Sequence, residues 1–372
     1  MTAVAGVASP RATALRAVLP AYLAARALTV LAIVLGAEQR GGSVSWTLLR
    51  AGFLHWDAVS YVEIAGHGYP AGLDYHDAFL PGFPLLVRAG SVVTGDLVAA
   101  ALLVSAAAEL VALLVIHELV RRERDPRVAL FAVWAIAFAP LGFFLTGLYT
   151  ESTFIAAAAV SLVLVRAGDV RGAALGAAVA VAVRMTGLAL LAAMAAELAV
   201  RHRMVRRETL WLAIVPLPLV LFGGYLQLRT GDALAFVHAQ SLPSFGEAPA
   251  WPWNGLRTTW RTAASSADPV NSAIFVREII AGMVGGLAVA AGWIDRRFPR
   301  SMAVYCTVAW LMAVSLTFWR SEARYDLALF PAVLVVADAT ARASFLRPLL
   351  VGAGAAALSW GVVVFTRGGW IG

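Results

Sequence analysis

Long apolar runs recur along almost the whole chain, and they constrain its fold more than any other feature. Apolar residues make up 61% of the 372 residues and charged residues only 14%, with a mean hydropathy of +0.79. A soluble domain is nearer half apolar and a quarter charged. Because a helix needs about 20 apolar residues to cross a bilayer, the sequence predicts an all-α, polytopic membrane protein with a single domain over residues 1–372. The runs lie at 14–36, 95–119, 128–148, 152–166, 172–200, 209–229, 273–294, 301–319, 325–341 and 348–366.

Clusters of arginine between these runs predict which ends face the cytoplasm, since basic residues concentrate in cytoplasmic loops. The rule places the N-terminus inside and the segments 37–94 and 230–270 outside, the second with interfacial helices rich in tryptophan. We expect about eleven membrane segments and a location in the plasma membrane. The clusters are Arg121, Arg122, Arg124 and Arg127; Arg166 and Arg171; Arg201, Arg203, Arg206 and Arg207; Arg296, Arg297 and Arg300; and Arg342 and Arg347.

The run 172–200 begins and ends at arginine clusters that the rule places on the same side. It must then cross an even number of times or not at all, yet each arm of about 12–14 residues rises only ~20 Å. The hydrocarbon core is about 30 Å thick. We therefore predict a hairpin of two short helices whose tip holds Arg184 at depth, where a broken helix must line protein or water.

The first outer segment contains an unusually polar stretch, LHWDAVSYVEIAGHGY at 54–69. In a helix, Asp57 and Tyr61 share one face, and Glu63 and His67 are neighbours four residues apart. One interpretation is an amphipathic interfacial helix with Trp56 and Tyr61 at headgroup level. The other makes Asp57 a general base just outside the bilayer.

A metal site is a weaker interpretation of the same segment. The spacing of its acids and histidines fits no strong metal signature, and the single cysteine, Cys306, lies in an apolar run. The sequence predicts no metal site and no cofactor, and it leaves a divalent ion open. The residues concerned are Glu63, His67, Asp74, His76 and Asp77.

Two further polar motifs, TGLYTES at 146–152 and VRMTG at 183–187, interrupt apolar sequence. Glu151 begins a run, where a carboxylate suits the positive end of a helix; alternatively it binds hydroxyl groups of a sugar or acceptor. An arginine inside an apolar hairpin is a functional-site hypothesis by default, and a guanidinium suits a phosphate. Alternatively, Arg184 pairs with a carboxylate and holds helices together.

The motif FWRSEARYDLALFP at 318–331 crosses an outer boundary with several charges. A salt bridge within the loop would explain them without a ligand. Arg320 and Arg324 beside Tyr325, on the same side as Asp57, instead suggest an anion site. Acids and arginines gathered on one side of the membrane match an enzyme with a lipid-phosphate substrate at the outer leaflet.

Four motifs, in order along the chain, resemble those of a known family. WDAVSYVEIAGHGY resembles the "WD…Y…IA…GY" signature of the PIG-V type of mannosyltransferase, which adds the second mannose of a GPI anchor and has similar proteins in bacteria. AFLPGFPLL resembles that family's "FFPLYPLL", LTGLYTESTF its "YSES-F", and AVRMTGLALL its "R-NG" hairpin. Thr186 stands where asparagine is usual.

The resemblance implies a GT-C glycosyltransferase bundle that takes mannose from polyprenyl-phosphate-mannose at an extracytoplasmic active site and inverts the anomeric centre. It makes Asp57 the general base, with Arg184, Arg324 and Arg320 on the donor phosphate. The acceptor stays open between a lipid-linked group, a glycan and a protein, and no nucleic acid is expected. Sugar or acceptor contacts are expected from Glu151, His67, Trp56, Tyr61, Glu63, Tyr149 and Tyr325.

Two alternatives stay open at this point. A GT-C enzyme with another polyprenyl-phosphate sugar, such as arabinofuranose, galactose or glucose, would differ only in a few hydroxyl contacts. A lipid or solute transporter would also bury an arginine in a broken helix, and it would need intramembrane acids, for which Glu109 is the main candidate.

Overall fold

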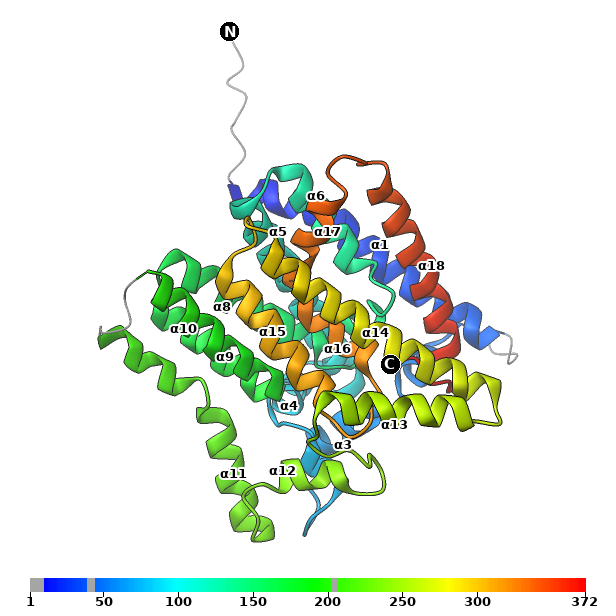
Figure 1. Cartoon of the computed structure of the whole chain (residues 1–372). Coiled ribbons are helices and arrows are strands. Elements are labelled where there is room, and N and C mark those ends of the chain that lie inside the picture. Colours follow the sequence, from blue (N-terminus) through cyan, green and yellow to red (C-terminus); the bar gives the residue numbers. More distant parts are fainter. Residues whose placement is uncertain (1–9, 39–43, 202–206) are drawn as a thin grey trace.

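The protein is a bundle of helices (Figure 1), seen in a computed structural model that describes residues 10–38, 44–201 and 207–372. Within those ranges the only extended pairing is an isolated antiparallel bridge between Pro249 and Leu316. The all-α class expected from the apolar runs is therefore confirmed. Residues 1–9, and with them the expected sidedness of the N-terminus, lie outside the described residues, as do Arg203 and Arg206 of the third arginine cluster.

The elements follow one another along the chain in a simple order. They are α1 (Pro10–Glu38), α2 (Trp46–Phe53), α3 (Asp57–His67), η1 (Tyr75–Ala78), α4 (Gly82–Thr94), α5 (Leu97–Glu123), α6 (Pro126–Ala137), α7 (Phe143–Thr146), α8 (Glu151–Ala167), α9 (Val170–Val183), η2 (Met185–Leu188), α10 (Ala189–Val200), η3 (Arg207–Ile214), α11 (Leu217–Thr230), α12 (Ala235–His238), η4 (Ala239–Ser241), α13 (Pro252–Ser265), α14 (Pro269–Ile294), α15 (Arg300–Val314), α16 (Glu322–Tyr325), η5 (Asp326–Ala332), α17 (Val333–Ala339) and α18 (Leu346–Thr366).

Several of the described helices are long and apolar enough to span a membrane, so the chain is a multi-pass membrane protein, as expected. Other apolar runs form shorter or broken helices. The run 128–148 is interrupted after Ala137, because Pro140 cannot continue a helix. The run 325–341 begins as the 3₁₀ helix η5, which contains Pro331. The five helices of spanning length are Thr13–Ala37, Leu97–Glu123, Arg207–Thr230, Pro269–Ile294 and Leu346–Thr366.

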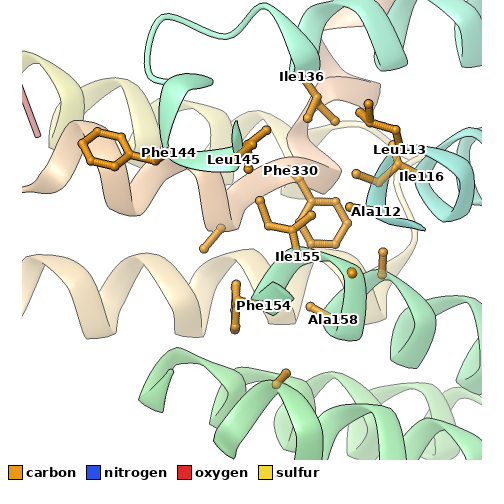
Figure 2. Close-up of a cluster of buried hydrophobic side chains, with 14 of the residues drawn as sticks. Ala112, Leu113, Ile116, Ile136, Phe144, Leu145, Phe154, Ile155, Ala158 and Phe330 are labelled. Carbon is orange, nitrogen blue, oxygen red and sulfur yellow. The ribbon is translucent and has the colours of Figure 1, made fainter. Parts of the chain in front are cut away.

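The core is built around α8, which packs between α5 and α9. Alanine-rich stretches on α8 and α9 let these backbones approach closely, as small residues do in membrane bundles. Figure 2 shows how the larger side chains fill the remaining space, with Leu113 and Ile116 of α5 near Ile155 of α8 and Phe330 of η5. Burial of α8 along its length fixes the position of Glu151 at its start.

The expected hairpin over 172–200 is present as α9 and α10, helices of 14 and 12 residues separated by Arg184 and η2. The turn depends on Gly187, because a Cβ there would lie 2.5 Å from the backbone nitrogen of Val181. Only a glycine allows η2 to fold back so closely on the last turn of α9. Arg184 therefore stands at the tip, as predicted.

Described members of four of the arginine clusters lie together at one end of the bundle. Arg124 Nη2 lies 2.5 Å from Asp338 Oδ2, and its Nη1 lies 3.4 Å from the carbonyl oxygen of Arg297. Arg166 Nη2 lies 2.6 Å from Glu123 Oε1, and Arg201 donates to the carbonyl of Arg166. These contacts link loops that the sequence analysis placed on one side of the membrane.

The segment 230–270 contains the expected helices. The longest, α13, exposes Trp253 and Trp260, and Trp253 stacks on Trp251 with ring centroids 5.1 Å apart. Arg320, Trp319 and their neighbours lie against this segment, since Thr317 N donates to Ala248 O at 2.9 Å. The location of α13 at the membrane interface stays a prediction.

Candidate active site

Asp57 is the first residue of α3, so its carboxylate lies at the positive end of the helix. The residue before it, Trp56, has φ 54°, and it is the one non-glycine residue with positive φ in the described part of the chain. Such a conformation is costly for a bulky side chain, and strained residues cluster at functional sites. The Trp56 ring packs edge-on against Trp370 at 5.1 Å, which holds the unusual turn in place.

Arg184, at the tip of the hairpin, is paired with a carboxylate. Its guanidinium contacts Glu151 at the start of α8, and its Nη1 donates to Thr150 Oγ1 at 3.1 Å. It also lies over the ring of Tyr325, 5.4 Å from the centroid. The pairing that was the structural alternative for Arg184 is therefore observed. Glu151 is the first residue of α8, so its carboxylate also lies at the positive end of a helix, as expected.

Arg324 joins the same group of charges from the other half of the chain. Its Nη1 lies 2.8 Å from Asp57 Oδ2 and its Nε 3.0 Å from Glu151 Oε1. Arg324 thus pairs outside its own loop, contrary to the alternative of a salt bridge within 318–331. One acid, Glu151, links both arginines, and the four charges form a continuous network at a single place.

Two cavities meet at this network. The inner cavity, of about 200 Å³, lies beside the hairpin tip and is lined by Arg184, Thr150 and Thr186 together with apolar side chains of α15. The outer cavity, of about 490 Å³, is lined by Trp56, Ser60, Asn271 and Arg320 among others. The residues that line both are Asp57, Phe79, Phe245, Glu247, Arg324 and Tyr325.

Glu247 is a cavity residue that the sequence analysis did not single out. It is only 8% exposed, and its nearest cation is Arg320, with 3.9 Å between Oε1 and Nε. Burial raises its pKa to about 7, although Arg320 and Arg324 act in the opposite direction. The sole signal in the sequence was one acid in an outer loop rich in proline and tryptophan, and nothing in that loop indicated which way the acid points.

The remaining predicted site residues divide into two groups. Trp56 lines the outer cavity, Tyr61 the inner one and Tyr325 both. Tyr149 lies behind the network, where its hydroxyl donates to the carbonyl of His55 at 2.9 Å. His67, at the end of α3, is not among the residues lining either cavity.

The expected neighbour pair of Glu63 and His67 is not the contact that Glu63 makes. Glu63 instead pairs with His76, with 3.0 Å between Oε2 and Nε2, and His76 also contacts Asp74 at the N-cap of η1. Asp77 is paired with Arg229 of α11. In the described ranges Glu63, Asp74, His76 and Asp77 all have partners. No group of three His, Cys, Asp or Glu side chains there is arranged to hold a metal ion.

An apolar cavity of about 490 Å³ lies next to the inner cavity. It is bounded by α3, α4 and α11, with Ile64, Leu85 and Phe222 in its wall. Consecutive residues separate the two spaces, since Leu80 lines the inner cavity and Pro81 the apolar one. A lipid chain is the kind of ligand that such a wall accommodates.

Glu109, the intramembrane acid that a transporter would need, is paired within the bundle. Arg26 Nε of α1 lies 2.9 Å from Glu109 Oε2, and Thr146 Oγ1 lies 3.4 Å from the same oxygen. None of the three residues lines the two cavities at Asp57. The site therefore lacks the acid on which the transporter alternative depended.

Part of the chain resembles the family expected from its motifs. The family evidence is a match of residues 42–205 to the profile of the family described as Mannosyltransferase (PIG-V). This region carries the motifs of Asp57, Glu151 and Arg184, and the predicted resemblance to the PIG-V family is confirmed over it.

Among solved structures, the chain is similar to the oligosaccharyltransferase of Archaeoglobus fulgidus in complex with zinc and sulfate, at 14% identity and a TM-score of 0.47, over 95% of this chain and 53% of that one. It is also similar to ArnT from Cupriavidus metallidurans bound to undecaprenyl phosphate, at 16% identity and a TM-score of 0.44, over 93% of this chain and 77% of that one. The chain thus spans about half the length of the archaeal enzyme. No curated protein matches it.

Proposed function

We propose that the protein transfers mannose from polyprenyl-phosphate-mannose to a hydroxyl group of an acceptor on the outer side of the plasma membrane. The observation that carries this proposal is the meeting of Asp57 and Arg184 at one cavity. These two residues belong to separate motifs within the region that matches the family. A carboxylate and a guanidinium side by side suit a reaction that removes a proton and expels a phosphate.

In this reaction Asp57 takes the proton from the acceptor hydroxyl. The hydroxyl oxygen then forms a bond to C1 of mannose from the face opposite the phosphate, and the anomeric centre inverts. The bond between C1 and the phosphate oxygen breaks, and the electron pair leaves with the lipid phosphate. Because that phosphate gains charge in the transition state, Arg184 and Arg324 stabilise it most when the charge is greatest.

The apolar cavity next to the site supports a lipid-linked donor. Its wall of Ile64, Leu85 and Phe222 fits a polyprenyl chain, and the neighbouring inner cavity holds Arg184 for the phosphate. A soluble nucleotide-sugar would make no use of the apolar wall. The donor phosphate would then lie where Leu80 and Pro81 separate the two spaces.

The arrangement of charge in the bundle supports an outward-facing site. The arginine clusters are linked to one another through Arg124, Arg166 and Arg201, and the positive-inside rule assigns such an end to the cytoplasm. Asp57 lies in the segment 37–94, which the same rule assigns to the outside. Transfer would therefore take place at the outer leaflet.

The proposal is tested with purified protein in nanodiscs, labelled polyprenyl-phosphate-mannose and a lipid and glycan extract of the host as acceptor. We expect the native protein to move label into a new product and Asp57→Asn to lose at least 100-fold of this activity, as expected when a general base is removed. Asp125→Asn is the matched control, because Asp125 caps α6 at the arginine-rich end and asparagine caps a helix equally well.

Each other outcome has a definite meaning. Turnover by Asp57→Asn close to that of the native protein would refute its role as base. Donors carrying arabinofuranose, galactose or glucose are run in parallel, and preference for one of them would replace mannose as the transferred sugar. Absence of both donor binding and transfer with every sugar would reject the glycosyltransferase reaction proposed here.

A further inference from the structure

Three carboxylates lie at or beside the junction of the two cavities, and they differ in their ion-pair and hydrogen-bond partners. Asp57 is 2.8 Å from a nitrogen of Arg324, and Glu151 is paired with Arg184 and Arg324. Glu247 has no such partner within 3.0 Å, since its nearest cation lies 3.9 Å away. No side-chain hydrogen bond to its carboxylate is found among the described residues. Because Glu247 lines both cavities, its carboxylate is free to accept hydrogen bonds from a ligand there.

The backbone around Glu247 holds it rigidly in position. Its own N–H donates to Gln240 O at 2.8 Å. The next residues pair with the segment after α15, where Thr317 N donates to Ala248 O at 2.9 Å and Ala250 N to Ser315 O at 2.9 Å. The backbone of Glu247 is therefore held in place, and its side chain lines both cavities, as does that of Asp57.

We propose that Glu247 binds the acceptor in its ionised form, by accepting hydrogen bonds from hydroxyl groups next to the one that attacks. This inference rests on the proposed function, and it makes Glu247 a specificity-determining residue for the acceptor. The chemical class that fits two neighbouring carboxylates, Asp57 and Glu247, is a polyhydroxylated one, a sugar with adjacent hydroxyl groups. The attacking hydroxyl meets Asp57 while its neighbour donates to Glu247.

The place of Glu247 in the outer cavity supports this assignment. That cavity brings flat aromatic rings together with small hydroxyl and amide side chains, a lining suited to sugar rings and hydroxyl groups. The aromatic residues are Trp56, Tyr75, Phe275 and Trp370, and the polar ones are Ser60, Ser244, Asn271 and Ser321. Arg184 lines only the inner cavity, so donor phosphate and acceptor would approach the junction from different sides.

The ionisation of Glu247 gives the proposal a pH signature. Arg320, Arg324 and Asp57 face Glu247, and Tyr325 and Glu322 lie close enough to interact with its charge. With a pKa of about 7, Glu247 is protonated at pH 6 and ionised at pH 8. An acceptor held by the carboxylate would bind more weakly at pH 6 than at pH 8.

Initial rates in nanodiscs test this with a saturating polyprenyl-phosphate sugar and a panel of octyl glycosides (mannoside, glucoside and galactoside) as acceptor probes. Glu247→Gln should raise the acceptor KM about 10- to 100-fold at pH 8, the value of hydrogen bonds to a charged group, while the donor KM stays unchanged. Glu247→Asp should recover part of the loss. The native acceptor KM should rise as the pH falls from 8 to 6, and that of Glu247→Gln should not.

Several results would overturn the proposal. An acceptor KM unaffected by Glu247→Gln, or the same pH dependence in both proteins, would make Glu247 a structural acid only. Glu118→Gln, at the arginine-rich end, serves as the control for a Glu-to-Gln change away from the cavities. A native protein that hydrolyses the donor to water yet transfers to no glycoside rejects the acceptor class and leaves the donor reaction standing. Absence of hydrolysis and of donor binding instead rejects the proposed function.

Discussion

Arg324 Nη1 lies 2.8 Å from Asp57 Oδ2, although the two residues are 267 positions apart in the sequence. This contact ties the first outer segment to the last part of the chain, and Arg324 also contacts Glu151, at the start of α8. The charges of Asp57, Glu151, Arg184 and Arg324 cancel. Buried charges are tolerated when they are paired in this way, and removing one partner leaves the others uncompensated.

Arg324→Ala should therefore destabilise the protein by about 3–5 kcal/mol, the cost of breaking a buried ion pair. Arg320→Ala is the matched control, because the Arg320 side chain is 37% exposed and surface changes usually stay within about 0.5 kcal/mol. Thermal unfolding in detergent measures both. Equal stability of the two variants would mean that the Arg324 network contributes nothing to folding.

Arg184→Ala should weaken donor binding more than it weakens the fold. Glu151 keeps Arg324 as a partner when Arg184 is lost, so its charge is not left unpaired. Loss of the hydrogen bonds from the guanidinium to the donor phosphate should raise the donor KM about 10- to 100-fold. The dependence of the transfer rate on donor concentration measures this. An unchanged donor KM would remove Arg184 from the phosphate site.

The raised pKa of Glu247 predicts that the free energy of unfolding depends on pH. The direction of the change follows from that pKa. The folded state holds the proton of this acid up to about pH 7, whereas the usual value is 4.5. Between these values the folded state binds more protons than the unfolded one, so stability falls as the pH rises. The resulting decrease in the free energy of unfolding is complete above pH 7 and is on the order of 3 kcal/mol.

Glu247→Gln removes this titration. The variant should gain stability relative to the native protein as the pH rises from 5 to 7, with little further change above 7. Thermal unfolding of both proteins between pH 5 and pH 8 measures the difference. A constant difference across this range would show that Glu247 is not the buried titrating acid. The stability lost by the native protein would be the cost of keeping a carboxylate for the acceptor.

The sequence was most informative where a regular residue pattern coincides with a physical requirement of helices or bilayers. Apolar run lengths predicted the helical membrane class. The arginine clusters predicted that both ends of the run 172–200 lie together, and the short arms then required a break at Arg184. These inferences depend on the dimensions of helices and bilayers, which hold without knowledge of the partners of each helix.

The partners of individual charges could not be predicted in the same way. Arg324 has acids two residues to either side in its own loop, Glu322 and Asp326, yet it pairs with Asp57 and Glu151. The packing of distant segments against one another decides which charges pair. No local sequence pattern shows how those segments pack. Glu247 was overlooked for the same reason, because contacts between residues distant in sequence, such as the bridge between Pro249 and Leu316, bring its loop to the site.

Gly187→Ala should destabilise the hairpin, since its Cβ would lie 2.5 Å from Val181 N in the backbone of α9. Overpacking of this kind costs about 1–3 kcal/mol. Gly224→Ala is the control, because nothing lies within 4 Å of a Cβ at that position in α11, and alanine favours a helix by up to about 1 kcal/mol. Thermal unfolding should therefore shift in opposite directions. A neutral Gly187→Ala would mean that η2 does not need its close approach to α9.

The topology of the hairpin is tested by labelling single cysteines at its two ends. The only native cysteine, Cys306, is buried, so background labelling should be low. Arg171→Cys and Arg201→Cys should both react with a membrane-impermeant maleimide from the cytoplasmic side, because α9 and α10 leave from and return to the same end of the bundle. Ala233→Cys, in the segment 230–270, should react from the opposite side. Labelling of the first two positions from different sides would require one arm to cross the whole bilayer, and Arg184 would then no longer stand at the tip of a re-entrant hairpin.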